Sequence, residues 1–433
     1  MSERRWLGTG AEPEAASAEL TGPVPDRLPN RLAICLWDFS WYTRAEPGGP
    51  YSSLEDAFEA TVARGYNAVR ICAAPLLLFG DGADDATIEV EGLGVAPDGG
   101  IYGRGTRWYD VPGGYRLDLR ERLFQLVETA ARHDVVVILA SWEYQQSPAF
   151  ARDRGWFDRI DATPLGSRFS ALARAFDRML SALDERGLSQ HIAFTELHNE
   201  IDFSVLPALD EAALADLARL RNAHPDQLVT VSYGRPPFAD MAAVPGQLDV
   251  GQFHVYTYGV LDALQRRIDI RSEGSEGFPN RQLRELLQPD APSPEGYGKP
   301  APWKLEATVI TDQMIYGYDW VDPDRWDLWL YDNYAVYREA MHREIASRVR
   351  AIAAWGRRNA RPVVIGEGWV GYTPLHGGFE EGPVGKDLAA SGIRSALEQG
   401  VWGMVPSSNA APHHPMFLDA AWQRRINDEI RSA

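Results

Sequence analysis

Short runs of apolar residues recur along the chain from Arg31 onward, and each is followed by a longer stretch with helical spacing of apolar positions. The first three runs and the seventh are rich in Ile, Val and Leu with little alternation, which is typical of parallel strands covered on both faces. Eight runs are expected to be strands: 32–39, 67–73, 135–142, 192–197, 228–233, 249–256, 362–368 and 401–408.

The stretches between these runs carry helix patterns. Leu123, Leu126, Val127 and Ala130 have the i, i+3, i+4, i+7 spacing of one buried helix face. The clearest helices are expected at 52–65, 118–134, 166–187, 209–223 and 332–358. Strands alternating with helices predict an α/β fold, a single (β/α)8 TIM barrel. No Gly-x-Gly-x-x-Gly follows the first strand, which disfavours a dinucleotide-binding sheet.

Two connections, one after strand two and one after strand six, are longer than a barrel requires. Residues 75–116 are rich in Gly and Asp, and a small hairpin is expected around 87–93. Residues 260–331 end in a group of aromatic residues, which favours a lid or a cleft wall over disorder. These aromatic residues are Tyr316, Tyr318, Trp320, Trp326, Trp329 and Tyr331.

Residues 1–30 are expected to form a flexible leader, because 9–26 is polar and rich in Pro, and residues 31–433 form the barrel domain. Arg4 and Arg5 are not followed by the apolar segment of a signal peptide. No apolar run reaches the ~18 residues that cross a bilayer. The sequence therefore predicts a cytoplasmic protein without membrane contact.

Charge and cysteine content exclude several functional classes. The formal net charge is −18, whereas a protein that binds nucleic acid needs a basic surface. Cys35 and Cys72 lie in strand-like runs and are expected to be free, buried thiols, too few for a disulfide framework or a four-ligand zinc site. The 14 Trp residues suggest either large core side chains or platforms on which sugars stack.

The polar residues that close each strand are the candidates for chemistry, because a TIM barrel carries its active site at the C-terminal ends of its strands. Glu196, His198 and Glu200 share strand parity and are expected to point to one side of the sheet. A deeply placed Glu196 needs a partner, and Arg70 on strand two is the expected one. Glu367 closes strand seven and is expected at the same barrel mouth as Glu200.

Two carboxylates at one barrel mouth meet the requirement of glycoside hydrolysis. One carboxyl group protonates the leaving oxygen, and the other attacks the anomeric carbon. This chemistry needs no cofactor and no metal. The adjacent His413 and His414 are not expected to share a metal, because neighbouring side chains on an extended chain point apart.

The strand ends resemble those of a clan A retaining glycoside hydrolase, near the cellulase-like branch of glycoside hydrolase family five. The resemblance covers roughly residues 31–430. It rests on 196-ELHNE-200, on Val-Arg-Ile in strand two, His-x-Tyr in strand six and Ile-Gly-Glu in strand seven, and on Trp402. It implies a TIM-barrel retaining O-glycosidase that acts on oligosaccharides or small glycosides by double displacement.

The resemblance also implies a role for each matching residue. Glu200 would be the acid/base and Glu367 the nucleophile. Arg70 would keep Glu367 ionised, and Tyr256 would bond to its carboxylate. Asn199 would bond the sugar 2-hydroxyl. The complete set of expected substrate-binding residues is Arg70, Asn199, His254, Tyr256, Trp402, Trp142 and Trp369, with His254 beside the nucleophile and Trp402 as the floor of the −1 subsite.

Two alternatives use the same barrel. One is a transglycosylase that passes the glycosyl group to a sugar, and the other is a non-catalytic carbohydrate-binding barrel. Ile201 stands where the family usually has Pro, and Ser141-Trp142 stands where it often has His. These departures keep the binding-only alternative open. The long connection at 260–331 could close one end of the cleft and give a pocket that acts on chain ends.

Overall fold

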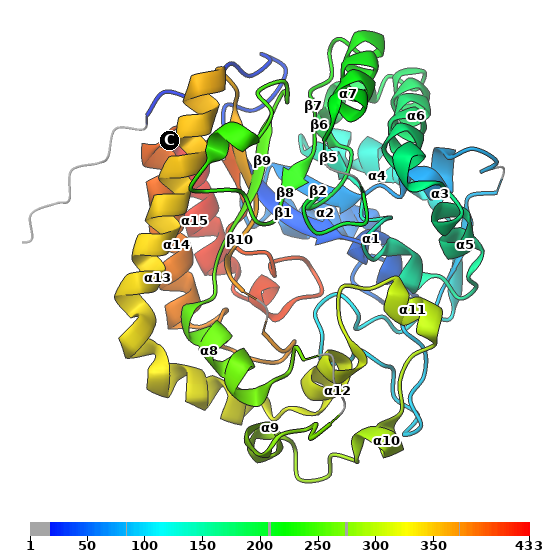
Figure 1. Cartoon of the computed structure of the whole chain (residues 1–433). Coiled ribbons are helices and arrows are strands. Elements are labelled where there is room, and N and C mark those ends of the chain that lie inside the picture. The colour runs from blue at the N-terminus through cyan, green and yellow to red at the C-terminus, as the bar shows by residue number, and fades with distance from the viewer. Residues whose placement is uncertain (1–17, 84, 207–208, 273–275, 372) are drawn as a thin grey trace, which may run out of the picture.

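A computed structural model describes residues 18–83, 85–206, 209–272, 276–371 and 373–433 (Figure 1). It confirms the predicted TIM barrel, since each of the eight expected runs contributes a strand to one parallel sheet. The barrel strands are β1 (Leu32–Asp38), β2 (Ala68–Cys72), β5 (Val136–Ala140), β6 (Ile192–Glu196), β7 (Val229–Thr230), β8 (Ser232–Tyr233), β9 (Gly251–Thr257), β10 (Val363–Val370) and β11 (Gly403–Met404).

The sheet closes on itself through the fifth run. Its strand order is β7-β6-β5-β2-β1-β11-β10-β9-β8, and all of these pairs are parallel. The two end strands, β7 and β8, are successive pieces of the run 228–233, separated by Val231. This run therefore links β6 on one side to β9 on the other and completes the ring.

Helices cover the outside of the ring (Figure 1). Among them, α4 packs on β5, α7 on β7, α13 on β9, α14 on β10 and α15 on β1. The helix expected at 332–358 begins nine residues earlier, where Asp322 caps it and Pro323 occupies its first turn. The helices outside the long second connection are α1 (Ser40–Thr43), α2 (Leu54–Val62), α3 (Pro75–Phe79), α4 (Leu119–Arg132), α5 (Gly155–Asp161), α6 (Leu165–Asp184), α7 (Glu211–Ala223), α13 (Pro323–Asn359), α14 (Pro383–Glu398) and α15 (Ala420–Ser432).

The lumen of the barrel changes from apolar to polar along its axis. Alternate residues of the strands fill its N-terminal end with an apolar cluster that includes Leu32, Ile34, Ala68, Phe194 and Trp402. The next inward positions on these strands are charged or polar. They are Asp38 on β1, Arg70 on β2, Glu196 on β6, and Gln252 and His254 on β9. Strand parity therefore points these polar side chains into the lumen, and their later positions in each strand place them toward the C-terminal mouth.

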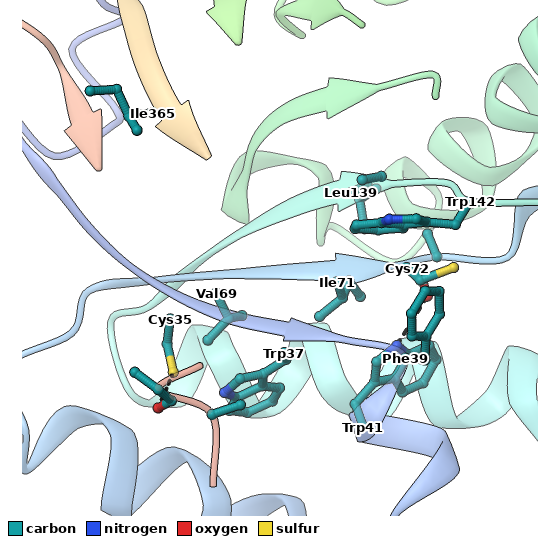
Figure 2. Close-up of a cluster of buried hydrophobic side chains, with 14 of the residues drawn as sticks. Cys35, Trp37, Phe39, Trp41, Val69, Ile71, Cys72, Leu139, Trp142 and Ile365 are labelled. Atoms are coloured by element: carbon teal, nitrogen blue, oxygen red, sulfur yellow. Dashed lines mark hydrogen bonds between the residues drawn. The ribbon is translucent and has the colours of Figure 1, made fainter. Parts of the chain in front are cut away.

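The larger apolar core lies between the strands and the surrounding helices. Figure 2 shows part of it, with Trp37, Phe39 and Trp41 from the β1–α1 segment beside Ile71 and Leu139 of the neighbouring strands. Trp41 donates its ring N–H to the backbone oxygen of Cys72 at 3.0 Å. Cys35 and Cys72 are both free and buried, as the sequence predicts.

The two long connections pack against each other above the mouth. The second contains α8 (Gly259–Ile268), α9 (Arg281–Leu286), α10 (Pro294–Tyr297), α11 (Pro302–Glu306) and α12 (Asp312–Trp320). Its Asp319 accepts hydrogen bonds from the backbone N–H groups of Gly103 and Gly105, both at 2.7 Å. Its buried Lys304 donates to Glu91 and to Ala151 O, both at 2.9 Å. The connections thus form one wall.

The expected hairpin around 87–93 is not a local one. Strand β3 (Thr87–Val90) pairs antiparallel with β4 (Tyr115–Asp118), which lies at the other end of the same connection. This pairing closes the first long connection at its base. The segment between the two strands is therefore held as a loop beside the mouth.

The described part of the expected leader, residues 18–30, is fixed to the barrel rather than free. Thr21 donates its backbone N–H to Gly400 O at 3.1 Å and its hydroxyl to Arg361 O at 2.8 Å. Arg27 donates to the backbone oxygen of Ile192 at 2.8 Å. The first 17 residues of that leader lie outside the described residues. Across the described ranges, none of the helices combines the length and the apolar character that a bilayer crossing requires.

Candidate active site

The barrel mouth holds a cavity of about 700 Å³. Its lining includes Glu200 and Glu367, with Asn199, Tyr256 and Trp142 around them. These residues come from the ends of two neighbouring pairs of strands, β5 with β6 and β9 with β10, which are separated in the ring by the run of β7 and β8. The structure therefore brings together most of the residues that the sequence singles out.

Arg70 is the centre of the charged layer beneath the cavity. Its side chain is fully buried. The guanidinium binds both carboxylate oxygens of Glu196, at 2.8 and 2.9 Å, and donates to Glu367 Oε1 at 2.9 Å. Burial alone would lower the pKa of Arg70, but Glu196 and Glu367 raise it above its usual value. The predicted Arg70–Glu196 contact is present, and the cation is shared with the candidate nucleophile.

Glu367 is held in its ionised form. Its Oε2 accepts a hydrogen bond from the Tyr256 hydroxyl at 2.8 Å and lies 3.5 Å from His254 Nδ1. Burial raises the pKa of Glu367, but His254, Arg70 and Tyr256 lower it by more, so that the pKa lies below its usual value. A deprotonated carboxylate is the form that a nucleophile needs.

Glu200 sits on a strained turn just beyond β6, with φ of 44°. Its backbone N–H donates to Ser232 Oγ at 2.8 Å. Its Oε1 lies 2.8 Å from His254 Nδ1, and its Oε2 accepts from Gln145 Nε2 at 3.1 Å. A non-glycine residue in the left-handed region is uncommon and often marks a functional position.

His254 links the two candidate carboxylates. Its Nδ1 faces both Glu200 and Glu367, while its Nε2 is buried without a hydrogen-bond partner among the described residues. Burial lowers the pKa of His254, but Glu367 and Glu200 raise it by more, so that the pKa lies above its usual value. Because carboxylate oxygens lie on both sides of Nδ1, this nitrogen carries a hydrogen and donates toward them.

Glu200, His254 and Glu367 each offer one atom within 4.8 Å of the others. Such a triad could ligate a cation. However, Glu367 already accepts bonds from Arg70 and Tyr256, and the adjacent buried guanidinium opposes a second cation. The same closeness suits two carboxyl groups acting on one small reacting centre.

Two aromatic residues of the expected set do not reach the cavity. Trp402 lies at the N-terminal end of the lumen, where its ring packs with Phe194 and its ring N–H donates to Pro29 O at 3.0 Å. It therefore plugs the barrel floor instead of lining a sugar subsite. Trp369 points away from the lumen toward Gly392 of α14 and donates to Val405 O at 3.1 Å.

A comparison with known protein families identifies the family of the chain. The profile of the "Cellulase-like" family, described as sugar-binding cellulase-like, matches residues 34–150 and 301–431, which is more than half of the chain. This chain belongs to the cellulase-like family. The resemblance predicted from the strand ends is thereby confirmed, and no curated protein matches the sequence.

Solved structures share the fold of this cellulase-like protein. A protein from Parabacteroides distasonis with a provisional glycoside hydrolase description is 21% identical, with 94% of each chain covered and a TM-score of 0.62. An endo-1,4-beta-mannanase from Rhizomucor miehei is 10% identical, with 96% of this chain and 100% of that chain covered and a TM-score of 0.47. At 21% identity, the likeness to the Parabacteroides distasonis protein shows the fold alone.

The cellulase-like site also contains residues that the sequence reasoning missed. Asp38 closes β1, lines the cavity and accepts from the ring N–H of Trp108 at 2.8 Å. Burial, together with the nearby Glu367, raises the pKa of Asp38 to about 8. Its place at the end of the first strand was a usable signal. Trp108 and Gln145 lie in connections and carried no comparable signal.

His198, which shares strand parity with Glu196 and Glu200, is a core residue. It is fully buried and bonds to the backbone through both ring nitrogens, with Nδ1 2.6 Å from Asn199 O and Nε2 3.3 Å from Tyr144 N. Burial lowers its pKa to about 3, so it stays neutral. It holds the connection after β5 against the turn that carries Glu200.

The lowered pKa of Glu367 predicts a pH-dependent contribution to stability. A carboxylate of this kind stabilises the fold above its unfolded pKa of ~4.3, and the contribution is lost as pH falls through the lower folded pKa. We therefore expect the free energy of unfolding of the wild type, relative to Glu367→Gln, to be constant near neutral pH and to decline below about pH 4.5. Denaturant titrations from pH 3 to 7 measure this difference. A difference that grows on acidification would contradict the assignment.

Proposed function

We propose that this cellulase-like protein is a retaining O-glycoside hydrolase, with Glu200 as acid/base and Glu367 as nucleophile. The observation that carries the proposal is the closeness of the two carboxylates, whose nearest oxygens lie within 4.8 Å. Retaining enzymes place the two carboxyl groups ~5–5.5 Å apart, whereas inverting enzymes leave ~6.5–9.5 Å for a water molecule. The short spacing supports direct attack of the Glu367 carboxylate on the anomeric carbon, as in a retaining enzyme.

In the first step, Glu367 attacks the anomeric carbon, the glycosidic C–O bond breaks, and Glu200 transfers its proton to the leaving oxygen. In the second step, Glu200 takes a proton from water, which attacks the same carbon and releases Glu367. Arg70 and Tyr256 keep Glu367 ionised before attack. Asn199, whose amide lies at the edge of this layer, is the proposed partner of the 2-hydroxyl group.

The cavity beside Glu367 supplies the features that a sugar ring needs. Trp142 lines it and is itself covered by the Arg70 guanidinium, 4.7 Å from the ring centroid. Trp108 also lines it and offers an apolar face, which we propose in place of Trp402 as a stacking surface. Asp38 and Asn409 add polar groups for sugar hydroxyls.

Activated aryl glycosides test the catalytic pair. With a panel of glucoside, mannoside, galactoside, xyloside, fucoside and arabinofuranoside, we expect the wild type to turn over at least one glycone. Glu367→Ala should lower that rate by roughly 10³-fold or more, because the nucleophile is lost. Glu200→Ala should lower turnover by about 10²–10⁴-fold, and azide should restore it with formation of a glycosyl azide.

Other results would favour the alternatives. Turnover that survives Glu367→Ala would contradict the proposed nucleophile. Sugar binding in calorimetry without turnover of any glycoside would indicate a carbohydrate-binding barrel. Transfer of the glycosyl group to an added sugar in preference to water would indicate a transglycosylase that uses the same residues.

We also propose that the enzyme acts on chain ends. Arg107, buried beside the cavity, contacts Glu381 and donates to Thr373 Oγ1 at 2.8 Å, so it ties the connection after β2 to the segment after β10. Asp319 ties the same connection to α12 through Gly103 and Gly105. These contacts support a wall on the side of the cavity near Glu367, which would limit the number of sugars bound there.

The first products released from an end-labelled oligosaccharide of the accepted sugar show whether the enzyme acts on chain ends. We expect a single monosaccharide from the non-reducing end as the first product, because the wall leaves little room beyond the −1 subsite. Samples taken in the first few per cent of conversion and separated by chromatography give the product lengths. An early mixture of intermediate lengths would show a groove open at both ends and contradict the proposal.

A further inference from the structure

Gln145 lies in the turn that follows β5, next to the candidate acid/base. Its backbone N–H donates to Trp142 O at 2.9 Å, which closes the turn. Its partly exposed side chain reaches into the cavity. It stands outside the residue set that the sequence resemblance supplies, so its contacts provide independent information on the site.

The direction of every hydrogen bond around Gln145 follows from Arg70. A guanidinium can only donate, and Arg70 Nη2 lies 2.6 Å from Asn199 Oδ1, so that atom is an acceptor. Asn199 Nδ2 must then donate to Gln145 Oε1, at 3.0 Å. Gln145 Nε2 is left to donate to Glu200 Oε2, at 3.1 Å. The network itself fixes the orientation of both amides.

The position of Glu200 depends on these hydrogen bonds. Its backbone is in the left-handed region, and its side chain is partly exposed on the cavity wall. A Cβ atom on Gly234 would lie 2.3 Å from Glu200 Oε1, so the glycine leaves space for this rotamer. One carboxylate oxygen faces His254 and the other faces Gln145. Loss of Gln145 would free one side of the carboxyl group.

We propose that Gln145 is a positioning residue for proton donation by Glu200. The inference rests on the proposed glycosidase function. The amide of Gln145 transmits the fixed orientation of Arg70 and Asn199 to Glu200 Oε2 and sets the plane of the carboxyl group. That plane determines whether the proton points at the leaving oxygen, and general acid catalysis requires hydrogen-bond geometry at that atom.

The test compares two leaving groups on one accepted glycone. A glycosyl fluoride or dinitrophenyl glycoside needs little or no proton donation, whereas a phenyl or methyl glycoside needs it fully. For Gln145→Met, which keeps the volume and removes both hydrogen bonds, we expect kcat/KM to fall about 10–100-fold for the poor leaving group. For the activated substrate kcat/KM should fall less than about 3-fold. This parameter reports only the steps up to the first bond cleavage, and that cleavage needs little proton donation from Glu200 when the leaving group is activated.

Gln146→Met is the matched control. This neighbouring amide also lines the cavity, but it accepts from the Tyr109 hydroxyl at 2.6 Å and forms no hydrogen bond with Glu200. Any loss of kcat/KM in this variant should be the same for both leaving groups. An equal loss for both leaving groups in Gln145→Met would overturn the positioning role and leave a structural one.

Gln145→Glu tests the same role through the pH dependence of kcat/KM. The introduced carboxyl group can still accept from Asn199. It can donate to Glu200 only while protonated, and its ordinary pKa is ~4.3. For the poor leaving group, we expect the variant to approach the wild type at acid pH and to lose kcat/KM relative to it as pH rises. A ratio that does not change with pH would count against the inference.

The activity of the wild type distinguishes failure of the proposed function from failure of the role of Gln145. If it cleaves neither leaving group on any glycone, the proposed function fails, and the role of Gln145 in that reaction fails with it. If the wild type cleaves both substrates and Gln145→Met loses kcat/KM equally for the two leaving groups, the proposed function stands. The positioning role of Gln145 is then overturned.

Discussion

The buried guanidinium of Arg70 is the interaction on which the rest of the site depends. It is fully buried and binds Glu196, Glu367 and Asn199 at once. Because arginine does not lose its proton in proteins, its charge is constant across the pH range in which a carboxylate titrates. A buried charge of this kind is tolerated only when it is paired and hydrogen-bonded. Two carboxylates and one amide provide that pairing.

The same cation defines two chemically different carboxylates. Glu367 touches Arg70 directly and also accepts from Tyr256, so it is held ionised. Glu200 makes no direct bond to Arg70; the amides of Asn199 and Gln145 connect the two, and Glu200 lies farther out on the cavity wall. Environments that differ in this way are how one site assigns different roles to two carboxyl groups. His254 lies between them and couples them.

Much of this arrangement follows from strand parity and order in the sequence. The eight runs predicted the barrel, and the parity of Glu196 with the position of Arg70 predicted their contact. Glu367 was predicted at the mouth because it closes a strand. The bulge between Ile365 and Glu367 could not be anticipated, although it shifts the register of β10 against β9. This irregularity explains why Glu367 faces the lumen, since unbroken alternation from the inward Val364 would place Gly366 there instead.

The failures arise where non-local contacts decide the structure. Trp402 was expected as the floor of the −1 subsite, but it lies before β11 and packs in the apolar floor of the barrel. The strand at 87–90 pairs with 115–118 across a long loop. Residues 18–30 read as a leader by composition but are fixed by backbone contacts with Arg361 and Gly400. Local pattern carries no information on these partners.

The most direct test of the central claim is a covalent trap at Glu367. A 2-deoxy-2-fluoro glycosyl fluoride of the accepted sugar slows both steps but slows the second more, so the glycosyl-enzyme should accumulate. Mass spectrometry of the intact protein and of its peptides locates the label. We expect one glycosyl group per chain, attached to the peptide that contains Glu367 and absent from Glu367→Gln. A label on another carboxylate, or hydrolysis of the parent glycoside with inversion at the anomeric carbon, would contradict it.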